Sequence, residues 1–192
     1  MRVRIISEHG YSEALFGLGL SHGVTSGKNV LGAAAEKRMR AVALHLAGKD
    51  GGHNKFLRQI SVWLDITAPL YWWKEFDTYK VGTTAQSEST MHTLLKKPLE
   101  EGHFEGPLPD AVLGELREAW NAQDFHRLNA MLPHSFRQRR IVSCNYAVLR
   151  NILMQRRNHK LPEWHTFREN ILSQAIYYEF LMPVGEEHET AL

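Results

Sequence analysis

The sequence PLYWWKEFDTYKVGTTAQSESTMH, residues 69–92, joins a dense aromatic segment to a run of polar residues. The segment begins with a proline, which is tolerated in the first turn of a helix because its missing N–H would have no partner there. Leu70, Trp73 and Phe76 then recur at helical spacing. This spacing predicts a short helix that buries an aromatic face.

The polar half of the stretch, residues 83–90, has no apolar periodicity and consists mainly of hydroxyl and amide side chains. Short polar side chains and free backbone N–H groups can hydrogen-bond a polar ligand, so the run is typical of a ligand-facing loop. A solvated connector rich in serine and threonine fits the composition equally well. The sequence leaves both interpretations open.

Upstream of this stretch, the pattern predicts two strands, two helices and a turn. Residues 60–67 place an apolar side chain at every second position, which indicates a strand with one buried face. The turn is Gly-Gly-His-Asn at 51–54 and carries His53. The clearest helix, 33–46, is alanine-rich, basic on one face and followed by a glycine stop. A short strand is predicted at 2–6 and a weak helix, interrupted by glycines, at 11–26.

Downstream, residues 97–109 contain prolines, glycines and charges and predict a loop or lid. Further predicted elements are helices at 110–121, 124–132 and 145–157, a strand or extended segment at 136–143, and a last helix from Pro162. Core candidates in that helix are Phe167, Ile171, Leu172, Ala175, Ile176 and Tyr178. The chain end, 184–192, predicts a frayed acidic tail.

Composition and charge indicate one globular domain, residues 1–192. A chain of this length with 43% hydrophobic content can bury a sizeable core, and a net charge of +2 is too small to indicate a nucleic-acid or membrane partner. Cys144 is the only cysteine, so no internal disulfide can form. No His or Cys spacing predicts a metal site. With no signal segment and no apolar run of bilayer length, we expect a soluble cytoplasmic protein.

A set of features occurs in a recognisable order over roughly residues 50–180. The matching positions are His53, Pro69, Lys80, Thr83, Gln86, the pair Leu132-Pro133, Asn145, Leu149 and Arg156. These features resemble the flavin-dependent thymidylate synthases, which methylate deoxyuridylate using FAD. That family has a proline and an aromatic helix after its strand. An arginine-histidine-arginine motif follows, and a later helix reads asparagine, any residue, arginine-serine-leucine, with a second arginine eleven positions after the asparagine.

The resemblance implies an α+β fold with an antiparallel sheet flanked by helices. It also implies an enzyme that binds FAD and a uridine nucleotide similar to dUMP. Methylenetetrahydrofolate and NADPH are further implied reactants, and a homotetramer would build each site from several subunits.

The family also implies roles for particular residues. Arg156 would lie over the pyrimidine carbonyls and stabilise negative charge that develops in the ring. His53 would contact the flavin region, Lys80 its phosphates, and Asn145 its isoalloxazine or adenosine end. The complete implied cofactor set is His53, Lys80, Thr83, Asn145 and Asn151. The implied substrate set is Glu75, Gln86, Ser87, Glu88, Thr90 and Arg156.

The chain departs from the family where the family binds phosphate. Thr78-Tyr79-Lys80 replaces the basic triplet, so only its last position is basic. Two phosphate-contacting arginines are replaced by Thr90 and Asn129, and the first arginine of the later helix by Ala147. Each charge-assisted hydrogen bond is worth about 1.5–3 kcal/mol, so losing two would weaken phosphate binding by orders of magnitude. Arg139 or Arg140 could replace them from another direction.

Three functions of different classes remain open. The first is an FAD-dependent enzyme acting on a uridine nucleotide. The second is a non-catalytic relative that keeps the fold and binds a nucleotide or a partner protein. The third is a nucleic-acid-binding protein that uses the basic segments 137–140 and 150–157. Without the resemblance, His53 would be a surface histidine, Arg156 a solvated helix end and the tryptophans core residues.

Overall fold

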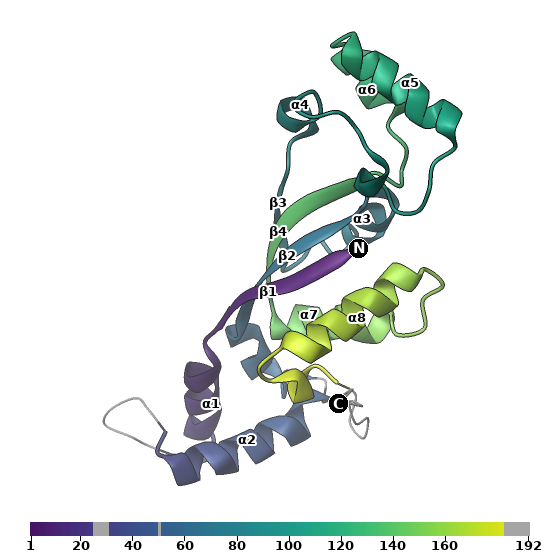
Figure 1. The fold of residues 1–192 in the computed structure, drawn as a ribbon. Helices are drawn as coiled ribbons and strands as arrows, with labels where there is room; N and C mark the ends of the chain where they lie inside the picture. The colour runs from purple at the N-terminus through teal and green to yellow at the C-terminus, as the bar shows by residue number, and fades with distance from the viewer. Residues whose placement is uncertain (25–30, 50, 183–192) are drawn as a thin grey trace.

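The computed structural model describes residues 1–24, 31–49 and 51–182. In these residues an antiparallel sheet of four strands has the order β1-β2-β4-β3 (Figure 1). The strands are β1 Arg2–His9, β2 Ser61–Pro69, β4 Arg137–Asn145 and β3 Thr84–Ser87. Helices flank this sheet, so the predicted α+β fold with an antiparallel sheet is confirmed.

One face of the sheet carries the main core. The β2 side chains that point to this face are fully buried, as the period-two pattern predicted, namely those of Val62, Leu64, Ile66 and Ala68. Three helices contribute to the same core, namely α3 Leu70–Phe76, α7 Tyr146–Gln155 and α8 Pro162–Gln174. The strand and helices predicted for these segments are therefore confirmed.

The predicted aromatic helix forms as α3 and occupies the centre of this core. Trp72, Trp73 and Phe76 are all buried, and the Trp72 ring lies 4.6 Å from that of Trp164 on α8. The indole nitrogen of Trp73 donates a 2.9 Å hydrogen bond to the backbone oxygen of Gln138 on β4. Burying each of these large side chains stabilises the fold by roughly 1.5–3 kcal/mol, so α3 fixes α8 to the sheet.

A second helical layer lies where β1 ends. It consists of α1 Tyr11–Leu20, α2 Ala33–Ala47 and the 3₁₀ helix η1 Lys55–Gln59, and η1 also contacts α7 (Figure 1). Gly10 joins β1 to α1 with a φ of 90°, and a Cβ atom there would lie 2.3 Å from the Gln59 backbone oxygen. Glycine is therefore required at the point where α1 meets η1.

A smaller core forms beyond the other end of the sheet. Helices α5 Asp110–Asn121 and α6 Phe125–Met131 pack with the segment that precedes them, which contains the short helices α4 Thr90–Thr93 and η2 Glu101–His103. The buried residues are Leu94, Leu99, Phe104, Leu113, Leu116, Ala119 and Leu128. Residues 97–109 are mostly irregular, as predicted, but Leu99 and Phe104 anchor them in this core.

Three expectations from the sequence need correction or lie outside the description. The polar run 83–90 is not a loop, because it forms edge strand β3 and leads into α4. All four β3 residues are exposed, so neither face needed apolar side chains. Ile176 and Tyr178 were predicted as core residues, but they are 62% and 38% exposed, because α8 ends before them. The short helix η3 Tyr178–Phe180 follows. The predicted tail 184–192 lies outside the described residues.

Candidate functional site

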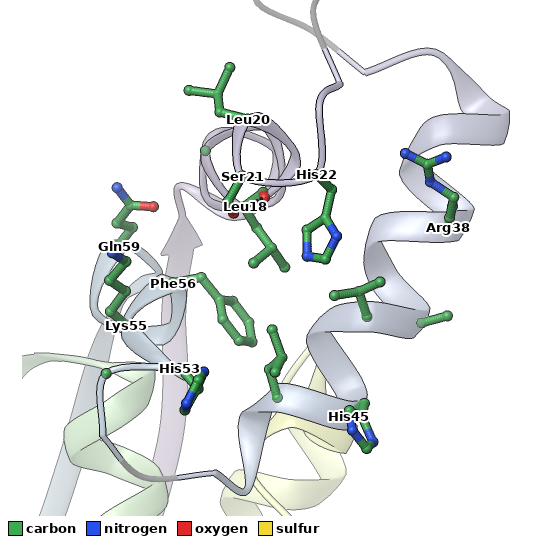
Figure 2. Close-up of a pocket in the computed structure, with 15 residues that line it drawn as sticks. Leu18, Leu20, Ser21, His22, Arg38, His45, His53, Lys55, Phe56 and Gln59 are labelled. Atoms are coloured by element: carbon green, nitrogen blue, oxygen red, sulfur yellow. Dashed lines mark hydrogen bonds between the residues drawn. The ribbon is translucent and has the colours of Figure 1, made fainter.

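A cavity of about 1000 Å³ lies between α1, α2 and η1, and His53 forms part of its wall (Figure 2). We call this cavity the His53 pocket. Its volume is at the upper end of the range of roughly 300–1,000 Å³ that is typical of small-molecule sites. Its lining residues are Gly17, Leu18, Leu20, Ser21, His22, Arg38, Ala41, Val42, His45, Leu46, Gly52, His53, Lys55, Phe56 and Gln59.

The pocket combines apolar walls with basic side chains. Leu18 and Phe56 point into the cavity, and Phe56 is only 3% exposed because it belongs to the main core (Figure 2). Among the described lining residues five are basic and none is acidic, the basic ones being His22, Arg38, His45, His53 and Lys55. A cavity of this kind suits a flat aromatic ligand that carries negative charge.

The local sequence explains how His53 reaches the pocket wall. Gly51 and Gly52 have φ values of 72° and 85°, which glycine adopts without steric cost. The chain can therefore turn sharply after α2 and present His53 at the cavity. Phe56 and Leu57 of η1 are buried immediately afterwards and hold the turn in place.

Most of the pocket was missed from the sequence, which pointed only to His53. Arg38 and His45 lie on α2, whose basic face is visible in the sequence. A basic helix face is usually a solvated surface, however. Only the packing of α1 and η1 beside α2 places these residues around a cavity.

The residue predicted to be catalytic, Arg156, lies at the end of α7 in a different environment. Its Nε donates to the Tyr79 hydroxyl at 2.8 Å, and its Nη1 donates to Glu75 Oε2 at 3.2 Å. The guanidinium carbon lies 4.8 Å from the centre of the Trp164 ring. Such stacking on an indole stabilises a cation by about 0.5–2 kcal/mol. Arg156 is thus held by protein groups on several sides.

Glu75 accepts hydrogen bonds from two residues and has a third basic neighbour. Besides Arg156, the Trp164 indole donates to Glu75 Oε2 at 2.8 Å, and His159 Nε2 lies 3.3 Å from the same oxygen. His159 Nδ1 accepts from the backbone N–H of Leu161, so Nε2 is the nitrogen that carries a proton toward Glu75. We call Glu75, Tyr79, Arg156, His159 and Trp164 the Glu75–Arg156 cluster. The structure brings the predicted residues Glu75 and Arg156 together, but as partners of each other.

The other predicted cofactor residues lie along α7 and the turn that precedes β3. Asn145 caps α7, because its Oδ1 accepts from the backbone N–H of Val148 at 3.0 Å. Asn151 Oδ1 accepts from Gln155 at 3.1 Å. The Thr83 hydroxyl donates to the backbone oxygen of Tyr79, and Lys80 is exposed in the same turn. None of these four predicted cofactor residues lines the described part of the His53 pocket.

The remaining predicted substrate residues follow the sheet edge. Gln86 and Ser87 belong to β3 and are exposed, while Thr90 begins α4. Glu88 lines a smaller cavity of about 340 Å³ together with Thr93, Leu94, Lys96, Lys97, Leu99, His103, Phe136 and Arg137. Within one chain, the predicted residues therefore lie in four places rather than in one site.

Arg139 and Arg140, suggested as substitutes for the missing phosphate ligands, each bind a carboxylate of the protein. Arg139 binds both carboxylate oxygens of the buried Asp65, at 2.8 and 2.9 Å. This hydrogen bonding holds the pKa of Asp65 below its ordinary value, against the opposing effect of burial. Arg140 donates to Asp77 at 2.8 Å and lies 4.2 Å from the centre of the Trp73 ring. Neither arginine is available to phosphate without giving up a carboxylate.

Other potential reactive centres are weak. In residues 1–24, 31–49 and 51–182 no three His, Cys, Asp or Glu side chains gather as a metal site would require, although three histidines line the His53 pocket. Burial raises the pKa of the Cys144 thiol to about 12, which makes it a poor nucleophile. None of the helices in this part of the chain has the length and apolar character needed to cross a bilayer.

Comparison with known proteins extends this description. No protein-family model and no curated protein sequence matches the chain. Its structure is similar to solved structures of the flavin-dependent thymidylate synthase of Helicobacter pylori in complex with FAD and dUMP. One has a TM-score of 0.69 at 16% identity and covers 90% of this chain and 93% of its own. Another has a TM-score of 0.71 at 16% identity, with coverages of 94% and 97%. The chain therefore has the fold of the flavin-dependent thymidylate synthases, as the resemblance of its sequence predicted.

Proposed function

We propose that the protein is a flavin-dependent enzyme that methylates, or otherwise modifies at C5, a uridine nucleotide similar to dUMP. The observation that carries this proposal is the His53 pocket in a chain with the fold of FAD-dependent thymidylate synthases. The fold supplies the type of reaction. The pocket supplies room and chemistry for a large, flat, negatively charged molecule.

The pocket residues fit FAD. Phe56 and Leu18 offer apolar contacts to an aromatic ring system, and no described lining residue is acidic, so the diphosphate would meet no like charge. His53 lies at the wall and would contact the ring. When bound, FAD would supply the hydride that reductive methylation consumes. Lys80 and Thr83, in the turn before β3, and Asn145 and Asn151, at the start of α7 and within it, complete the proposed cofactor set.

Arg156 would act on the nucleotide in this scheme. Glu75 and Tyr79 hold its Nη1 and Nε, and Trp164 lies against the guanidinium plane, so the side chain has little freedom to move. A cation fixed in this way can stabilise negative charge on a pyrimidine oxygen without reorganising. Gln86, Ser87, Glu88 and Thr90 on the sheet edge would provide the remaining substrate contacts, with methylenetetrahydrofolate as carbon donor and NADPH as reductant.

The separation of these residues within one chain favours a site shared between subunits, so we propose a homotetramer. The sheet offers a surface for such contacts, because the face opposite α7 and α8 leaves Trp63 38% exposed. Tryptophan is enriched at the centres of protein interfaces. Sedimentation velocity would show the assembly. We place the protein in the cytoplasm, where its single buried cysteine would stay reduced.

The decisive experiment is an absorption spectrum of the purified protein, followed by titration with FAD. We expect visible flavin absorption, or its uptake on adding FAD. Arg156→Ala should abolish dUMP binding while FAD binding persists. A colourless protein that takes up no FAD would contradict the proposal.

A non-catalytic relative that binds a nucleotide is the second candidate. The observation that favours it is the ion pair of Arg156 with Glu75, which leaves less positive charge for a nucleotide. Thr78, Thr90 and Ala147 also add no phosphate-binding cation. Under this function, saturating FAD, dUMP, folate and NADPH give no turnover even though ligands bind. Nucleic-acid binding is disfavoured, because Arg137, Arg139 and Arg140 are each paired with a carboxylate.

A further inference from the structure

Arg38 and Lys55 differ from the arginines that form ion pairs in the described residues. Seven arginines form ion pairs with carboxylates in the described residues, namely Arg4, Arg40, Arg127, Arg137, Arg139, Arg140 and Arg156. Arg38 and Lys55 form neither an ion pair nor a side-chain hydrogen bond with any other described residue. Both side chains line the His53 pocket.

The two cations lie on opposite walls of that pocket. Arg38 extends from α2, and Lys55 extends from the start of η1 beside His53 (Figure 2). His45 also lies on α2, and His22 extends from the turn after α1. No acidic residue among the described lining residues balances the charges of Arg38 and Lys55. An anionic ligand placed between the walls would supply the missing partner.

We propose that the His53 pocket selects phosphorylated aromatic ligands and that Arg38 and Lys55 hold their phosphate groups. The identity of the ligand as FAD rests on the proposed function; the phosphate preference rests on the pocket alone. Lys80 is exposed in the turn before β3 and is not among the described residues of the pocket. Arg38 and Lys55 would thus add to the pocket two basic groups that the family pattern does not include.

The expected effect is large enough to measure. Each charge-assisted hydrogen bond to phosphate changes affinity by roughly tenfold to a hundredfold, with solvent-exposed groups toward the lower figure. FAD and riboflavin share the same ring system, so the ratio of their affinities isolates the contribution of the phosphates and adenosine. ADP carries two phosphates without the flavin and tests the anion site separately.

Calorimetric titration of the full chain with FAD, riboflavin and ADP provides the test. The variants are Arg38→Gln, Lys55→Gln and their combination. Lys37→Gln is the matched control, because Lys37 is exposed on α2 next to Arg38 but does not line the described part of the pocket. For the unaltered protein we expect FAD to bind at least tenfold more tightly than riboflavin. The double variant should lose that preference and its ADP binding, while riboflavin affinity stays within about twofold. Lys37→Gln should behave as the unaltered protein.

The outcomes separate this proposal from the proposed function. If FAD binds but the double variant binds it equally well, or Lys37→Gln weakens FAD binding as much, the phosphate assignment is wrong and the flavin function stands. If no flavin binds but ADP does, and the double variant loses ADP, the assignment stands and the flavin function fails. Equal affinities of FAD and riboflavin for the unaltered protein overturn the assignment, as does the absence of binding by all three ligands. Circular dichroism confirms that each variant is folded.

Discussion

The His53 pocket and the Glu75–Arg156 cluster use basic residues in opposite ways. In the cluster, Arg156 has a carboxylate, a hydroxyl and an indole ring as partners, and its side chain is only 19% exposed. In the pocket, Arg38 and Lys55 are exposed and have no carboxylate partner among the described residues. A cation with its own partners contributes mainly to structure and orientation. A cation without them is available to a ligand.

The largest effect should come from the aromatic wall of the cluster. Trp164→Ala removes a fully buried ring that contacts Trp72, Phe76 and the guanidinium of Arg156. We expect the free energy of unfolding to fall by about 3–5 kcal/mol, because the cavity is added to the lost burial. Denaturant titration measures the change. A loss below about 1 kcal/mol would mean that the cluster does not support the fold.

The sheet contains a second cation that is held by a carboxylate. Asp65 is buried, and Arg139 binds it through two hydrogen bonds. We expect Asp65→Asn to cost about 1.5–3 kcal/mol at neutral pH, since hydrogen bonds between charged groups are lost.

The pH dependence of that cost follows from the pKa of Asp65. Hydrogen bonding to Arg139 lowers the folded-state pKa below the ordinary value of 3.8. The stabilisation is therefore complete above the ordinary pKa and is lost as pH falls through the lower folded value. Chemical denaturation of both proteins from pH 7 down to about pH 2 should show their stabilities converging in acid. A difference that stays constant over this range would contradict the ion pair.

Removing the charge of Glu75 should lower the free energy of unfolding less than removing the ring of Trp164 beside it. Glu75→Gln keeps the shape of the side chain but leaves Arg156 without its carboxylate, and we expect a loss of about 1–2 kcal/mol. Glu118 provides a matched control, because its pairing with Arg127 at 3.7 Å is exposed on the surface. Glu118→Gln should change stability by less than about 0.5 kcal/mol. Equal losses of stability in the two variants would mean that the ion pair of Glu75 with Arg156 contributes no more than an ordinary surface ion pair.

The parts of the fold that the sequence predicted are those with a strong apolar period. Strand β2 has apolar residues at every second position because one of its faces is buried. Helix α5 was predicted to be capped by Asp110 and to run through about Asn121, and it spans Asp110–Asn121. Strand β3 escaped prediction because an exposed edge strand needs no apolar face. Its pairing with β4 depends on residues more than fifty positions away, which no local pattern contains.

For the candidate site, the sequence supplied single residues but not their surroundings. His53 could be identified from the turn before β2, whereas Arg38 depends on α2 lying beside α1 and η1. Arg156 could be aligned with the family, but its pairing with Glu75 requires α3 and α7 to be adjacent. Whether a cation is bound by the protein or open to a ligand is decided by such tertiary contacts, so spacing alone could not distinguish the two.

The smallest effect on stability should come from the pocket. Arg38→Gln and Lys55→Gln alter exposed side chains, so in the absence of ligand each should change the free energy of unfolding by less than about 0.5 kcal/mol. Added FAD separates these variants from the unaltered protein. At a hundred times its dissociation constant, a ligand that binds only the folded state adds about 2.7 kcal/mol of stability. Thermal unfolding with and without FAD should show this gain in the unaltered protein and a smaller gain in both variants. A ligand-free loss as large as that of Glu75→Gln would mean that these cations stabilise the fold, and the contrast between the two regions would disappear.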